Sequence, residues 1–230
     1  MTDPVPAVLF DFDGTLTTRD SFRAVLRQGW RERPWTFLLA AAGFPVFALS
    51  VLARGEKRYV KSWLLWTLTV GLKHRRALEQ LASWGRSLGS DESFWRDDVI
   101  ARYHGHRNAG QLLIICTASA AEWVAPAMEA AGLRCDVMLG SPLVHRWGGL
   151  MLGGPNCYAK EKTRRIERWL RLRRDEKVRF VASYSDHPSD IPLLNLADTA
   201  WVILRKASDA RQFRKRLAAP WRVVGSLDGM

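Results

Sequence analysis

Residues 7–17 read AVLFDFDGTLT, and this stretch says more about the fold than any other part of the chain. Its apolar start predicts a buried strand, and Asp11 and Asp13 follow where Gly14 allows the chain to turn. Residues i and i+2 of a strand point the same way, so both carboxylates can converge on one small volume. Like charges that close are unfavourable unless a cation lies between them or one acid is protonated. The stretch favours a divalent-metal site in which one acid is a nucleophile and the other an acid/base, with a capped turn as the alternative.

Beyond residue 110 the chain alternates between apolar runs and helical patterns. The runs that predict strands are residues 111–116, 135–139, 178–183 and 199–204, and the glycine-rich residues 142–154 predict a hairpin or a loop. Apolar strands separated by helices indicate a parallel sheet covered on both faces, so we expect a Rossmann-like, doubly wound α/β core. Ligands bind such sheets at the carboxyl ends of the strands, where Asp11, Thr117, Asp186 and Asp190 are expected.

The composition narrows the class of partner. The 230 residues include 35 Lys and Arg against 23 Asp and Glu, a formal net charge of +12. Such an excess indicates a polyanion: nucleic acid, anionic lipid or a phosphorylated substrate. The sequence has no zinc-finger spacing, helix-turn-helix signature or RNA-binding aromatic motif, so nucleic acid is not expected. Three scattered cysteines indicate a reducing compartment, and an N-terminus without a basic run predicts no signal peptide.

The positive charge is concentrated between Arg19 and Arg76, where 12 basic residues stand against three acids. The same region holds two apolar runs, residues 35–53 and 62–72, and four of the eleven tryptophans. Apolar segments with tryptophans and a basic fringe are attracted to anionic membrane surfaces. We therefore expect membrane contact near residues 34–72, with a buried helical hairpin and a solvated basic rim as the alternative.

The length of these runs predicts how the membrane is contacted. The 19 residues of the first run would extend ~28 Å as a helix, close to the ~30 Å of a bilayer core, but Gly43 and Pro45 interrupt them. The second run, at ~16 Å, is too short to return across the bilayer. A single crossing would separate Asp11 from Asp186, which must share its site. A monotopic or re-entrant attachment is therefore expected.

With these positions in view, the chain resembles the haloacid dehalogenase superfamily, in its phosphatase branch with a helical cap between the first two motifs. The matching motifs are DFDGTLT at 11–17, LLIICTAS at 112–119, CYAKEK at 157–162 and YSDHPSD at 184–190. The chain departs from the branch at Ala159, where a glycine is usual. The resemblance implies a catalytic core of residues 1–18 and 110–230 and an all-helical cap of residues 19–109.

The matched acids have the chemistry of a magnesium-dependent phosphomonoester hydrolase. Asp11 would attack phosphorus and form an aspartyl-phosphate, while Asp13 would protonate the leaving alkoxide and later activate water. Mg²⁺ prefers oxygen ligands and phosphate, and Asp11, the main-chain oxygen of Asp13, and Asp186 would hold it. Asp190 would either support this metal site from behind or cap the helix that follows.

Two further residues would bind the substrate phosphate. Lys162 would hold a non-bridging oxygen by charge, and Thr117 would donate a hydroxyl hydrogen bond. Outside these motifs, Lys162 would be interpreted as part of a solvated basic helix face and Thr117 as an ordinary hydroxyl at a strand end.

Within the cap, residues 31–71 resemble the membrane-associated cap of the bacterial phosphatidylglycerophosphatase C family. This implies conversion of phosphatidylglycerophosphate to phosphatidylglycerol at the cytoplasmic face of the bacterial inner membrane, with an anionic phospholipid surface as partner. The alternative is a soluble small-metabolite phosphatase of the phosphoserine phosphatase type. In that case Asp20, near the start of the cap, would be a candidate for binding a substrate ammonium group.

Overall fold

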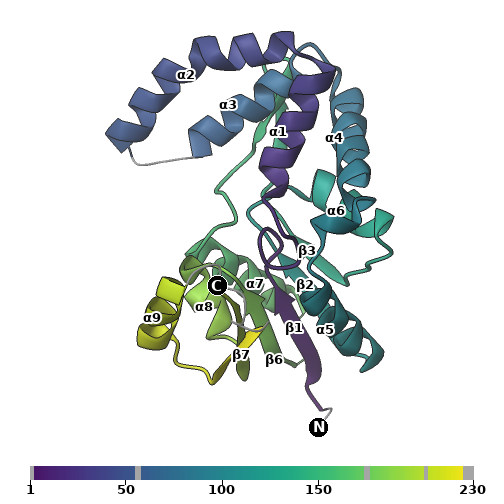
Figure 1. The fold of residues 1–230 in the computed structure, drawn as a ribbon, viewed down its shortest axis with the longest axis vertical. Helices are drawn as coiled ribbons and strands as arrows, with labels where there is room; N and C mark the ends of the chain where they lie inside the picture. The colour runs from purple at the N-terminus through teal and green to yellow at the C-terminus, as the bar shows by residue number, and fades with distance from the viewer. Residues whose placement is uncertain (1–2, 55–57, 174–176, 205–206, 225–230) are drawn as a thin grey trace.

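The computed structural model describes residues 3–54, 58–173, 177–204 and 207–224, and its centre is a six-stranded parallel sheet. The strands follow the order β3-β2-β1-β6-β7-β8 (Figure 1). Their bounds are Val5–Phe10 for β1, Leu112–Cys116 for β2, Val137–Leu139 for β3, Val178–Ser185 for β6, Thr199–Ile203 for β7 and Trp221–Val224 for β8. The predicted α/β core is confirmed, and the predicted strand positions differ only at their ends. Strand β8 has no counterpart among the predicted strands.

Helices cover both faces of the sheet, as the continuous apolar strands require. In β1, Val8 and Phe10 pack in one cluster and Ala7 and Leu9 in another, and all four are fully buried. The first cluster includes side chains of α5 (Asp97–Asn108) and α6 (Ala121–Ala130), and the second includes side chains of α7 (Lys160–Leu172) and α8 (Ile191–Leu194). Helix α9 (Ala207–Arg216) packs near β7 through Phe213.

Four helices stand together beyond the carboxyl end of the sheet (Figure 1). They are α1 (Ser21–Glu32), α2 (Trp35–Arg54), α3 (Arg58–Thr69) and α4 (His74–Gly89). Pro45 lies inside α2, which continues past it, so the interruption predicted there does not end the helix. Gly43 is a packing site: a Cβ on it would meet the Trp63 ring of α3 at 2.4 Å. The two apolar runs of the sequence therefore form an α2–α3 hairpin.

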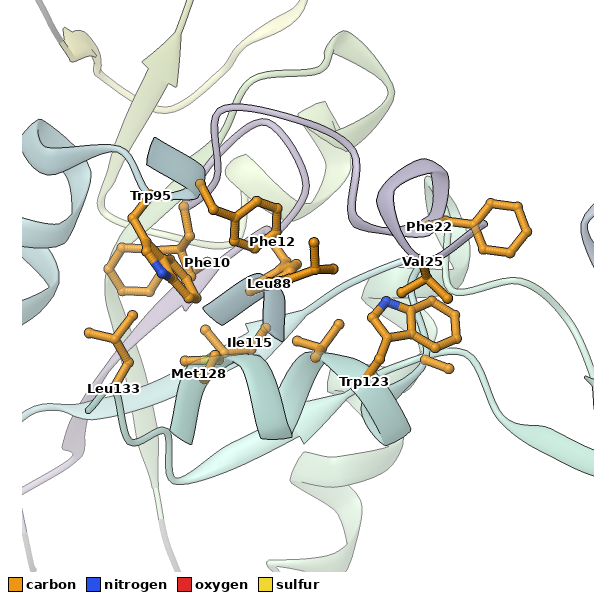
Figure 2. Close-up of a cluster of buried hydrophobic side chains, with 14 of the residues drawn as sticks. Phe10, Phe12, Phe22, Val25, Leu88, Trp95, Ile115, Trp123, Met128 and Leu133 are labelled. Carbon is orange, nitrogen blue, oxygen red and sulfur yellow. The ribbon is translucent and has the colours of Figure 1, made fainter. Parts of the chain in front are cut away.

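A continuous hydrophobic cluster joins these cap helices to the sheet. Figure 2 shows Phe10 and Ile115 of the sheet in one group of side chains with Leu88 of α4, and Phe22 of α1 beside Trp123 of α6. Helices α4 and α6 approach closely, since a Cβ on Gly89 would meet the main chain of α6 at 2.0 Å. The cap is thus packed on the core rather than joined only by linkers.

Packing divides the chain differently from the predicted cap of residues 19–109. Helix α5 lies within that range but packs against the sheet, where Tyr103 contacts the Phe10 ring at 5.2 Å. Conversely, the hairpin of β4 (Leu143–Arg146) and β5 (Gly149–Leu152) lies outside it but packs on α3, with Leu150 N donating to Thr69 Oγ1 at 2.7 Å. The elements within the described part of residues 19–109 are all helices. The β4–β5 hairpin, which comes from the part of the chain assigned to the core, packs with them.

The outer face of α2 is apolar and exposed. Its large exposed side chains are Trp35 (49%), Phe37 (51%), Leu38 (69%), Phe44 (55%), Val46 (67%) and Leu49 (66%). Of the helices in the described residues, none combines the length and the apolar character needed to cross a membrane. An exposed apolar surface of this kind is typical of a contact with a membrane or with another protein.

Candidate active site

The two acids of the first motif lie where β1 ends beneath the cap. Gly14 adopts a φ of 80°, which glycine tolerates without strain, and the main-chain N–H groups of Thr15, Leu16 and Thr17 return to Phe12 O at 3.0–3.2 Å. This tight turn holds Asp11 and Asp13 at the edge of a cavity of about 540 Å³ between the sheet and the cap. Lys162, Asp186 and Asp190 line the same cavity, so all the predicted acids and the predicted lysine come together.

Lys162 is buried in the site and forms ion pairs with two of its acids. Its side chain is 2% exposed, and Nζ donates to Asp11 Oδ1 and to Asp190 Oδ2, both at 2.6 Å. Burial acts to lower the pKa of Lys162, but the Asp11 and Asp190 carboxylates raise it well above its usual value. The lysine is therefore cationic. Its predicted alternative, a solvated helix face, does not describe it.

Asp190 supports this lysine. Its Oδ2 also accepts from Ser185 Oγ at 2.9 Å, and its side chain makes no capping bond to α8. The side chain of Asp190 therefore does not cap α8, and the helix-cap interpretation is wrong. The carboxylate instead holds the ammonium group of Lys162 against Asp11.

The acids form a site that suits a divalent cation. Burial raises the pKa of Asp11 well above its usual value, with further contributions from Asp190 and Asp186 and an opposing one from Lys162. Thr15 Oγ1 donates to Asp186 Oδ1 at 3.1 Å and so fixes that carboxylate nearby. In the described part of the chain no three His, Cys, Asp or Glu side chains form a metal site by themselves. Two carboxylates with a main-chain oxygen, phosphate oxygens and water fit Mg²⁺, which usually keeps several such ligands.

Asp13 is oriented by two hydrogen bonds, one to each of its carboxylate oxygens. Ser21 N, at the start of α1, donates to Oδ1 at 2.6 Å, and Ser119 Oγ donates to Oδ2 at 2.6 Å. Trp123 Nε1 in turn donates to Ser21 Oγ at 3.1 Å. Burial, then the nearby Asp20 carboxylate, raises the pKa of Asp13. A raised pKa suits a carboxyl group that has to hold a proton for a leaving group.

Thr117 is not among the residues that line the cavity. It is fully buried, its Oγ1 accepts from Ser119 N at 3.0 Å, and its neighbours Ala118 and Ser119 line the cavity. The hydroxyl supports the loop that carries these neighbours. Its role as a phosphate ligand stays a prediction.

Lys61 belongs to the cavity, although its place between Arg19 and Arg76 puts it among the basic residues expected to face a membrane. Its side chain enters the cavity from α3 and donates from Nζ to Ala118 O at 2.6 Å. Its ammonium lies 4.9 Å from the Phe22 ring centre, and burial lowers its pKa, although Asp13 and Asp20 oppose that shift. One signal could have located it. Lys61 shares a helical face with Leu65 and Leu68, both fully buried.

The third motif contains a strained residue at the position where a glycine is usual. Ala159 has φ 51° and ψ −124°, a conformation that costs a non-glycine residue of order 1–3 kcal/mol. The turn that the glycine would make is therefore kept, and α7 begins directly after it with Lys162 in its first turn.

We expect Ala159→Gly to stabilise the protein by about 1 kcal/mol, because relief of strain exceeds the added entropy of the unfolded chain. Urea denaturation would measure the change. Ala101→Gly, at an exposed position inside α5, is the matched control and should destabilise by about 1 kcal/mol. Equal destabilisation in both variants would contradict strain at Ala159.

Comparisons with known proteins concern the family and the fold of the chain. A family model described as haloacid dehalogenase-like hydrolase matches residues 8–195. Protein CicA of Caulobacter vibrioides (strain NA1000 / CB15N) is 34% identical over 195 residues, which are 83% of this chain and 82% of that protein. A crystal structure of a protein of unknown function from Bordetella pertussis Tohama I has a TM-score of 0.68 at 20% identity, covering 97% of this chain and 99% of that one. A phosphoserine phosphatase, solved as a phospho-aspartyl intermediate analogue, has a TM-score of 0.57 at 13% identity, covering 97% and 95%. These two structural likenesses concern the fold.

Proposed function

The chain belongs to the haloacid dehalogenase-like hydrolases, and we propose that within this family it is a magnesium-dependent phosphomonoester hydrolase that forms an aspartyl-phosphate on Asp11. The observation that carries the proposal is Asp11 itself: a buried carboxylate that lines a cavity and is held at 2.6 Å by the buried ammonium of Lys162. Such a group is oriented for attack, and the Lys162 ammonium favours its charged form against the opposing effect of burial. The phosphoserine phosphatase described above was solved as an analogue of a phospho-aspartyl intermediate, which agrees with an aspartate as the nucleophile.

The chain's own residues account for both halves of the reaction. An Asp11 oxygen bonds to phosphorus as the bond from phosphorus to the substrate alkoxide breaks, and Asp13 gives its proton to that alkoxide. Asp13 then takes a proton from water, whose oxygen attacks phosphorus, releasing Asp11 and inorganic phosphate. Lys162 balances the charge of Asp11 and of the phosphate oxygens throughout. Mg²⁺, held by Asp11, the main-chain oxygen of Asp13, and Asp186, would supply charge neutralisation and alignment.

For the substrate we propose a lipid phosphate, and specifically phosphatidylglycerophosphate, hydrolysed at the cytoplasmic face of a bacterial inner membrane. The exposed apolar face of α2 supports a monotopic contact with such a membrane. Two cap cations, Arg23 and Lys61, line the cavity, and they support the choice of a substrate with a second negative group. A lipid of this kind carries a phosphodiester near its phosphomonoester, and a cap cation would bind that second anion.

The first test of this substrate is Lys61→Gln. Glutamine can still donate to Ala118 O, but the charge is lost, and a charge-assisted hydrogen bond contributes about 1.5–3 kcal/mol. We expect kcat/KM for phosphatidylglycerophosphate to fall roughly 10- to 100-fold and that for p-nitrophenyl phosphate to change little. Lys73→Gln, at an exposed cap lysine, is the matched control. Equal losses on both substrates would mean that Lys61 only supports the Ala118 loop.

The second test concerns the membrane. Leu38 and Leu49 are 69% and 66% exposed on α2, so replacing both with Asp should leave the fold intact. Each change removes an apolar contact of about 1.5–3 kcal/mol and places a charge against lipid, so vesicle binding should fall more than 100-fold. Activity on p-nitrophenyl phosphate should be unchanged. Leu172→Asp, at an 80% exposed leucine of α7, is the control and should bind vesicles like the wild type. Co-sedimentation with anionic vesicles measures the effect, and unchanged binding of the double variant would contradict a membrane role for α2.

Phosphate release from a panel of lipid and soluble phosphomonoesters, with and without Mg²⁺, tests the whole proposal. The proposed enzyme should prefer phosphatidylglycerophosphate in vesicles and should lose activity on chelation. A preference for phosphoserine or another small phosphate, with no gain from vesicles, would favour the soluble alternative. Absence of release from every substrate would overturn the phosphatase assignment.

A further inference from the structure

A second cavity lies on the cap, on the side of α3 away from Lys61. It has a volume of about 550 Å³ and lies between α3 and the β4–β5 hairpin. Its walls are mostly apolar and aromatic, formed chiefly by Tyr59, Trp63, Trp66, Val144, Met151 and Leu152, and we refer to it as the aromatic groove. The Trp63 and Trp66 rings stack at 5.0 Å, so one wall is a rigid aromatic surface. The volume of the groove and its apolar lining are typical of a site that binds a small ligand.

The polar groups along the groove are largely engaged within the protein. Trp66 Nε1 donates to Trp147 O at 3.0 Å, and Trp63 Nε1 donates to Ala40 O at 3.4 Å. Leu152 N donates to Ser62 Oγ at 3.0 Å. An extended peptide would need free main-chain partners along its length, whereas an apolar chain needs none. The groove is therefore better suited to a hydrocarbon chain than to a peptide.

The rim of the groove carries an exposed aromatic residue and a cation. Trp147, at the tip of the hairpin, is 70% exposed and has a φ of 51°, which is unfavourable for a bulky residue. The Arg146 guanidinium lies 4.6 Å from the centre of its ring. Among the described residues that line the groove there is no carboxylate. The rim thus has the charge and the amphipathic ring that an anionic headgroup region attracts.

The groove also lies beside α2. Trp63 forms one wall and at the same time packs against Gly43 of α2, so the groove adjoins the helix whose exposed face supports the proposed membrane contact. We propose that the aromatic groove binds one acyl chain of an anionic membrane lipid, with the headgroup at Arg146. This inference rests on the proposed membrane contact but not on the catalytic proposal.

The test uses vesicles of phosphatidylglycerol that carry a diazirine in the middle of one acyl chain. After illumination, mass spectrometry of the wild type should find label on α2 and also on residues 144–152 of the hairpin. Val144→Glu places a carboxylate in the groove and should reduce the hairpin label about tenfold while leaving the α2 label unchanged. Arg146→Glu, at an exposed position, should reduce it as well and cannot act through the core. Arg173→Glu is the matched control, because Arg173 lies 4.8 Å from the Trp169 ring on the far α7 and should leave both labels unchanged.

The α2 label separates the two ways in which the idea can fail. Label on α2 alone in the wild type would overturn the groove proposal but not the membrane contact. A peptide would then be the alternative ligand of the groove. Hairpin label that neither Val144→Glu nor Arg146→Glu reduces would also overturn it. Absence of label at both places would overturn the groove and the membrane contact together, while phosphate release from soluble substrates would still test the catalytic proposal separately.

Discussion

Asp11→Asn is expected to lower turnover by roughly 10⁴–10⁶-fold, because an amide has no anionic oxygen with which to attack phosphorus. The fold should survive the change. Burial and the neighbouring acids disfavour a charge on Asp11, and Lys162 keeps its second partner, Asp190, at 2.6 Å. We therefore expect an unfolding midpoint in urea equal to or above that of the wild type. Steady-state phosphate release and urea denaturation would measure the two effects.

The covalent intermediate provides an independent readout of the same residue. Beryllium fluoride, which mimics a phosphoryl group, should bind the wild type in the presence of Mg²⁺ and should not bind Asp11→Asn. Asp198→Asn is the control, because Asp198 is an exposed acid paired with Arg179 at 2.8 Å and lies outside the cavity. Retained activity in a correctly folded Asp11→Asn protein would rule out nucleophilic catalysis by this residue.

Asp13→Asn should lower turnover by about 10²–10⁴-fold, the usual contribution of a single general acid/base. Asparagine can still accept hydrogen bonds from Ser21 N and Ser119 Oγ with its carbonyl oxygen, although not both in the present geometry. The junction between α1 and the second motif should therefore loosen only slightly. Single-turnover kinetics would separate formation of the aspartyl-phosphate from its hydrolysis.

The leaving group distinguishes acid catalysis from a merely structural effect. An aryl phosphate has a good leaving group and needs little protonation, so its phosphorylation step should be slowed much less by Asp13→Asn than that of an alkyl phosphate. Hydrolysis of the intermediate should be slowed equally for both, because the intermediate is the same. An equal loss for aryl and alkyl phosphates in the first step would argue that Asp13 positions groups and does not transfer the proton.

The sequence predicted the catalytic core well where the signals are local. Strand β1 followed by Asp11, Asp13 and Gly14 can be predicted because the strand, the acids and the turn are consecutive, within residues 5–17. The apolar runs likewise predicted most of the strands, since parallel strands buried on both faces are apolar throughout. Lys162 was assignable only through its motif, because its surroundings in α7 are rich in arginine and its burial depends on Asp11 and Asp190.

Other features depend on contacts between distant segments. The direction of Lys61 into the cavity, and away from a lipid rim, is set by how α3 rests on the second-motif loop at Ala118, 57 residues further along the chain. The burial of Thr117 outside the cavity lining is likewise a property of the packed loop. Neither follows from charge or hydrophobicity alone, which are the same whether a side chain points inward or outward.

By itself, then, the sequence determined the α/β core, the order of its motifs, and the identity of the acids and the lysine that meet at the carboxyl end of the sheet. Those features follow from strand periodicity, turn chemistry and the fact that parallel strands end at one edge. Tertiary structure alone decided that α5 leaves the cap, that the β4–β5 hairpin joins it, and that Trp63 and Trp66 form a groove with Val144. The reason is physical: the hairpin contacts join residues 81 positions apart, Phe10 and Tyr103 are 93 positions apart, and only the packing of whole elements determines which residues meet.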